Sequence, residues 1–140
     1  MNALFPSVEL EIFKAVARLG LTFEVRDDAP NTFEALKAQC PGRHLIVWSG
    51  GSDNTVWSSP QVNYAFRAWH DYIHVQYGIP FTLEGEREVA RIQCRSLSAL
   101  GQALIQAEVE DQAEHFIKTG EFVADQRAFV LAKLRERGAL

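Results

Sequence analysis

The sequence has few of the residues that indicate a disulfide-stabilised protein or a nucleic-acid binder. Only two of its 140 residues are cysteines, Cys40 and Cys94, and they form no CxxC pair. This argues against a disulfide framework and favours a reducing compartment. The net charge is −4, and no run of lysine and arginine exceeds two residues. We therefore expect no nucleic-acid partner.

Long apolar segments are missing as well. No stretch approaches the ~20 residues that cross a bilayer, and the amino terminus lacks the basic region and apolar run of a signal peptide. We therefore expect a soluble, cytoplasmic protein with no membrane partner. The length of 140 residues and the apolar content of 47% indicate one globular domain.

Hydrophobic periodicity and turn residues predict an α+β fold in a single domain. Strands are expected at 21–26, 44–48 and 55–57, and helices at 7–19, 31–39, 60–77, 82–94, from 96 or 98 to 119, and 124–137. Ser7 and Asn31 are the expected N-caps of the first two helices. A small αβαββ portion (1–58) thus precedes a four-helix carboxyl-terminal bundle (59–140) that carries the candidate site.

The segment 49–54 is rich in glycine and serine. It has neither the lysine of a GxxxxGK[ST] loop nor GxGxxG spacing, so a tight turn is favoured over a phosphate-binding loop. We expect this turn to return residues 55–57 as a hairpin partner of the strand at 44–48.

Two histidines on the helix expected at 60–77 predict a metal site. His70 and His74 are four residues apart, so their rings project from one side of the helix, as in HExxH motifs. Asp71 occupies the position of the HExxH glutamate and is the candidate general base. Alternatively, the histidines are bonded to neighbours and Asp71 is paired with Arg67 one turn back.

Two carboxylates on the following helices are candidate ligands of the same ion. If the helices on either side of Gly78 form a hairpin, Glu86 should approach His74. The face of the long helix changes from apolar to polar at Glu108, a carboxylate that would need a partner if buried. We expect Arg67, Asp111, Gln112 and His115 to lie around the ligands as supporting residues.

Two histidines with one or two carboxylates suit Zn²⁺, Mn²⁺ or Fe²⁺ and leave a coordination position for water. A bound divalent ion brings the pKa of this water toward neutrality, and Asp71 would accept its proton. The sequence therefore predicts a metal-dependent hydrolase whose substrate is unknown.

The order of these residues resembles a family of uncharacterised proteins found mostly in phages and prophage-like elements. The resemblance covers about residues 62–123 and rests on the segment Phe66–His74, Phe81, the pair Gly85-Glu86, Glu108 and Gln112. Members carry an FRA-x-HD segment with a second histidine, a GE pair, and a later Glu and Gln. The resemblance implies a metal site and a phage-associated origin, but no activity.

Two other hypotheses remain open at this point. The chain is small and acidic and has three tryptophans, so it could be a phage-encoded binding or inhibitor protein that acts on a host protein. Trp48 or Trp57 would then be its anchor. Alternatively, the polar residues form a purely structural His–carboxylate–Arg network that fixes the register of the helices.

Overall fold

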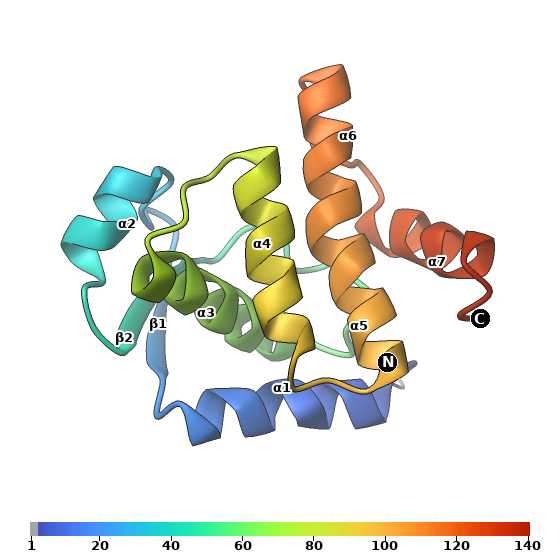
Figure 1. Ribbon diagram of the computed structural model, residues 1–140, viewed down its shortest axis with the longest axis horizontal. Helices are drawn as coiled ribbons and strands as arrows, with labels where there is room; N and C mark the ends of the chain where they lie inside the picture. Colours follow the sequence, from blue (N-terminus) through green and yellow to red (C-terminus); the bar gives the residue numbers. More distant parts are fainter. Residues whose placement is uncertain (1–2) are drawn as a thin grey trace.

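The computed structural model describes residues 3–140, so the expectation for the first two residues of the amino terminus lies outside it. A two-stranded parallel sheet lies in the amino-terminal part and helices follow it, which confirms the predicted α+β class (Figure 1). The elements are α1 (Pro6–Arg18), β1 (Thr22–Arg26), α2 (Phe33–Gln39), β2 (His44–Trp48), α3 (Pro60–Tyr77), α4 (Leu83–Cys94), α5 (Ala99–Ile105), η1 (Gln106–Asp111), α6 (Gln112–Thr119) and α7 (Gln126–Glu136).

The two strands are parallel and α2 connects them. The pairing runs in register from Thr22 opposite His44 to Arg26 opposite Trp48. Parallel neighbours need a crossover rather than a tight hairpin, and the seven-residue helix α2 lies within this crossover.

The predicted third strand at 55–57 is wrong. Within residues 3–140 the sheet has two strands, and residues 55–57 are bends with buried side chains. The apolar character of Val56 and Trp57 therefore reflects burial in the core rather than strand pairing. The guanidinium of Arg67 donates to the carbonyl oxygens of Trp48 and Gly50, both at 2.6 Å. These bonds hold the chain against α3 as it leaves β2, so it does not turn back along the sheet.

Helix ends lie where they were predicted in α3, α4 and the long helix, whereas α7 is shorter than the predicted 124–137 and has Asp125 as its N-cap. The starts of the first two helices also differ. α1 begins at Pro6 with Phe5 as its N-cap, not at Ser7, because proline fits the first helical position. The hydroxyl of Thr32, rather than Asn31, accepts the N–H of Ala35 at the start of α2. Both differences move the boundary by one or two residues.

Helix α3 lies at the centre of the molecule and packs against α1, α2, α4 and β2 (Figure 1). Its buried residues are Val62, Asn63, Ala65, Phe66, Ala68, Trp69, Tyr72, Ile73 and His74. Trp69 and Ile73 are buried in one core with Leu97 and Leu104, and Leu100 packs half-buried against that core. Gly78, with a φ of +65°, ends α3 in the left-handed conformation that glycine adopts without strain.

The long helix predicted up to residue 119 is confirmed, with one irregularity. It begins at the N-cap Ser98 and ends at Gly120, but η1 in its middle is a π-helical turn. A π turn has i→i+5 hydrogen bonds and therefore rotates the side chains that follow it relative to an α-helix. Beyond it, α6 buries no residue and extends past the neighbouring helices (Figure 1).

None of the helices in residues 3–140 has both the length and the apolar character needed to cross a lipid bilayer.

Candidate metal centre

Two turns of α3 supply the two histidines of the site. Because His70 and His74 are one turn apart, their rings meet edge to face with centroids 4.7 Å apart. The His74 ring is fully buried, whereas the His70 side chain is 16% exposed. Solvent therefore reaches the pair from the His70 side.

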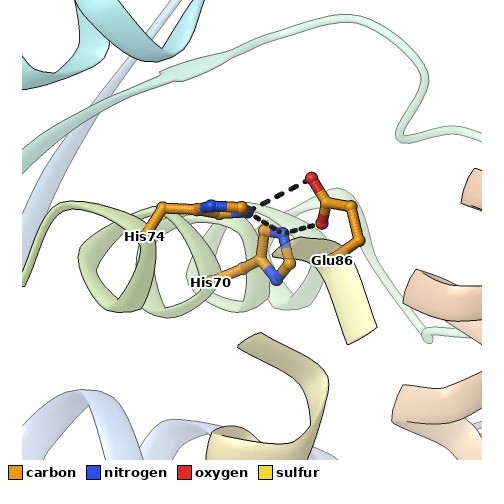
Figure 2. Close-up of side chains that lie close together, drawn as sticks. All are labelled: His70, His74 and Glu86. Carbon is orange, nitrogen blue, oxygen red and sulfur yellow. Dashed lines mark hydrogen bonds and ion pairs between the residues drawn. The ribbon is translucent and has the colours of Figure 1, made fainter. Parts of the chain in front are cut away.

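Glu86 on α4 completes the cluster, as the hairpin argument predicted. Its Oε2 lies 2.8 Å from His70 Nε2, and its Oε1 lies 3.2 Å from His74 Nε2. The two Nε2 atoms are 3.1 Å apart (Figure 2). His70, His74 and Glu86 are thus a group whose potential ligand atoms all lie within 4.8 Å of one another. We call these three residues the HHE cluster.

The outward-facing nitrogen of each histidine has its own acceptor. His74 Nδ1 lies 2.7 Å from the carbonyl oxygen of Ile79, and His70 Nδ1 lies 3.0 Å from the amide oxygen of Gln93. Both oxygens can only accept, so each Nδ1 carries a hydrogen and donates it. In a neutral ring the lone pair then lies on Nε2 and points into the HHE cluster.

Opposite charges shift the pKa values within the cluster. Burial by itself lowers the pKa of His70, but the charge and hydrogen bond of Glu86 outweigh it and raise the pKa to about 9. Burial acts on Glu86 in the opposite sense, yet the two histidines hold its pKa well below the usual range. Without a metal ion, His70 and Glu86 therefore form an imidazolium–carboxylate pair at neutral pH.

Asp71, the predicted general base, lies beside the cluster on α3. Burial raises its pKa to about 6, and the nearby His70 and His74 only partly oppose this rise. A carboxyl with this pKa is a more effective proton acceptor than an ordinary aspartate and is still largely ionised at pH 7. Its side chain is half-buried, so it is not sealed from solvent.

The structure does not bring Glu108, the predicted fourth ligand, into the HHE cluster. Glu108 lies on η1 and is 8% exposed. Its Oε2 accepts a hydrogen bond of 3.2 Å from Gln112, and its Oε1 is buried without a partner among residues 3–140. Burial raises its pKa to about 7, and Arg67 only partly offsets the effect. The prediction assumed that successive side chains are rotated by about 100° around the axis along the whole helix. The π turn changes this rotation at Glu108, so the side chain points elsewhere.

The four predicted supporting residues also have their partners elsewhere. Arg67 bonds to backbone carbonyls after β2, and Gln112 bonds to Glu108. Asp111 pairs with Arg137 at 2.7 Å, and the His115 ring packs 5.6 Å from that of Phe129. Gln93 and Ile79 hold the histidines instead, and sequence reasoning missed both in this role. Gln93 lies seven residues after Glu86 and so on the same helical face, a spacing that could have identified it.

Of the two tryptophans predicted as anchors for a partner protein, only Trp48 is on the surface. Trp57 is 2% exposed and belongs to the core, whereas Trp48 is 53% exposed. The Trp48 indole folds onto Gly50, where a Cβ would lie only 2.2 Å from its ring. The glycine-rich segment therefore leaves room for this side chain. The binding-protein hypothesis stays a prediction, with Trp48 as its one anchor.

The fold and the site together define an α+β protein with a His–His–Glu cluster between the consecutive helices α3 and α4, in which His74 is fully buried and the other two residues are partly exposed. The chain matches no family model, and neither the curated proteins nor the solved structures give a match. The resemblance to phage-encoded proteins stays a prediction.

Glu108→Gln should make the protein more stable above pH 7 than the wild type. The folded-state pKa of Glu108 is about 7, above the usual glutamate value of 4.5. A raised acid pKa means that the folded state binds more protons, so stability falls as pH rises from 4.5 through 7. The variant lacks this loss, and its advantage should grow to about 3 kcal/mol at pH 8. Urea denaturation at pH 4.5 and pH 8 measures it. An advantage that is equal at both pH values would contradict the assigned burial of this charge.

Proposed function

We propose that the protein is a metal-dependent hydrolase whose ion is held by His70, His74 and Glu86. The observation that carries the proposal is that both Nε2 atoms and the Glu86 carboxylate converge on one point, where they can bind a cation once His70 has lost its extra proton. Both Nδ1 atoms donate outward, so both Nε2 atoms and the Glu86 carboxylate face one another. Histidine ligands in metal sites have this arrangement, with the second ring nitrogen bonded to an oxygen acceptor.

The size of the HHE cluster suits an ion without a large rearrangement. A tetrahedral zinc ion with bonds of 2.0–2.1 Å keeps its ligand atoms about 3.3 Å apart. The two Nε2 atoms are 3.1 Å apart, close to that spacing. They lie 2.8 and 3.2 Å from different oxygens of Glu86, His70 Nε2 from Oε2 and His74 Nε2 from Oε1. An ion bound by both nitrogens would therefore meet one or both oxygens of this carboxylate.

Protons give the lone pairs of the HHE cluster fewer favourable contacts than a divalent cation would. One proton on His70 can bond to Glu86 Oε2, but His74 Nε2 is still 3.2 Å from Glu86 Oε1 with two lone pairs facing. A second proton, on His74, would place two imidazolium nitrogens 3.1 Å apart. A divalent ion attracts all three groups at once, and this difference favours the metal-site hypothesis over a purely structural network.

Three protein ligands leave a coordination position for water, and the ion supplies the acidity of that water. Asp71 is the group of this chain that we propose as the base. It would take a proton from the water as its oxygen attacks the substrate, and then return the proton to the leaving group.

Metal content tests the proposal directly. The protein is saturated with Zn²⁺, passed through a desalting column and analysed for bound metal. We expect about one equivalent for the wild type and none for His70→Ala or His74→Ala. His44→Ala is the matched control, because His44 lies on β2 with its side chain 54% exposed, and it should keep the metal. Equal metal content in all four proteins, or none in the wild type, would contradict the metal site.

The variant Asp71→Asn tests whether Asp71 acts as a general base or as a metal ligand. This variant should keep its zinc equivalent but lose hydrolysis of activated substrates such as p-nitrophenyl acetate or bis-p-nitrophenyl phosphate, by about 10²–10⁴-fold. Loss of the metal together with the activity would make Asp71 a ligand. Full activity without the carboxylate would remove it from the mechanism.

A further inference from the structure

We infer that Gln93 is a positioning residue of the HHE cluster and orients the His70 ring so that its Nε2 faces the ion. The inference rests on the proposed metal site and assigns a role to a residue outside it. Gln93 lies on α4, seven residues after Glu86, so both side chains project from one face toward α3. Its amide oxygen lies 3.0 Å from His70 Nδ1.

The hydrogen bond determines which ring nitrogen of His70 is free to bind a metal. An amide oxygen accepts and cannot donate, so in the neutral ring that binds a metal the hydrogen is on Nδ1 and the lone pair on Nε2. For His74 the same task is performed by the backbone carbonyl of Ile79, at 2.7 Å. That carbonyl is fixed by the turn after α3, whereas the acceptor for His70 is a side chain. Gln93 is therefore the point at which one substitution can release one of the two rings.

The surroundings of Gln93 argue that its amide is not there for packing alone. The residue is fully buried, and within the part of the chain that the structure describes its Nε2 has no hydrogen-bond partner. A fully buried donor without a partner opposes stability, and an apolar side chain of the same length would avoid that cost. What the amide contributes is the oxygen that it presents to His70.

Cobalt affinity in three variants tests this role. Gln93→Met keeps the length of the side chain but removes the acceptor, and Gln93→Glu keeps an acceptor oxygen. We expect Co²⁺ binding, followed by visible absorption, to weaken by about 10–100-fold in Gln93→Met. Gln93→Glu should stay within a few-fold of the wild type. Gln112→Met is the matched control, because Gln112 bonds to Glu108 outside the HHE cluster, and it should bind as the wild type does.

A second measurement needs no variant. In the zinc-loaded wild type, nitrogen-15 NMR of the histidine rings should place the metal on His70 Nε2 and a slowly exchanging hydrogen on Nδ1. Metal on Nδ1 would overturn the inference, and so would a Gln93→Met variant that binds Co²⁺ as tightly as the wild type while His70→Ala binds none. If the wild type binds neither Co²⁺ nor Zn²⁺, the proposed function fails together with the inference.

Discussion

Adding a chelator should lower the melting temperature of the zinc-loaded protein by roughly 15 °C at neutral pH. An ion that binds only the folded state, present at about 1,000 times its Kd, stabilises that state by about 4 kcal/mol. For a chain of this length each kcal/mol corresponds to roughly 4 °C. Differential scanning calorimetry of the loaded protein, before and after EDTA, measures the change.

The chelator effect should nearly vanish at about pH 5. Metal ligands must be deprotonated, so protons compete with the ion for both rings. Competition is strong here, because Glu86 raises the pKa of His70 to about 9 in the metal-free protein. Zinc affinity should therefore increase as pH rises toward 9 and be lost as pH falls. His74→Ala should melt at the same temperature with and without EDTA, whereas His44→Ala should respond as the wild type does. An identical response of wild type and His74→Ala at pH 7 would rule out the metal site.

Trp69→Ala should cost about 3–5 kcal/mol of the free energy of unfolding, the range measured for large aromatic residues in cores. Trp69 is 2% exposed and lies one residue before His70 on α3. Folded proteins of this size are stable by only about 5–15 kcal/mol, so the variant could be largely unfolded at 37 °C. Urea denaturation, followed by circular dichroism, measures the loss.

Trp48→Ala is the control for this substitution, because it removes the same side chain from the surface. Trp48 is 53% exposed, and we expect its loss to cost about 1 kcal/mol or less. Similar costs for the two variants would contradict the orientation of α3, which places Trp69 in the core and the two histidines toward α4.

Local spacing was sufficient to predict the part of the site that lies on one helical hairpin. The i, i+4 relation of His70 and His74 follows from helix geometry alone, and Glu86 follows from counting equal distances on either side of the turn. No long-range information is needed in either case. The α+β class was predicted in the same way, because apolar residues recur with a period of about 2 residues in the strands and about 3.6 residues in the helices.

The failures have two physical causes. The role of Glu108 was assigned with a constant helical phase, and a π turn is not visible in hydrophobic periodicity. Residues 55–57 carry β-branched and aromatic side chains, which strands and buried loops both favour. Only the tertiary bonds of Arg67 to the chain after β2 distinguish the two, and those contacts are 17 and 19 residues apart in sequence.

The connection between α3 and α4 has a consequence for the order in which the molecule folds. The His70–Glu86 contact spans 16 residues, and the bond from His74 to the carbonyl of Ile79 spans only five. Because the entropy of closing a loop increases only slowly with its length, the five-residue bond costs less to form than the pairing of Thr22 with His44, 22 residues apart, whereas the 16-residue contact costs about as much as that pairing. The turn after α3 is therefore the part of the site that forms with the smallest loss of entropy, and an ion bound by all three residues would add a link between α3 and α4.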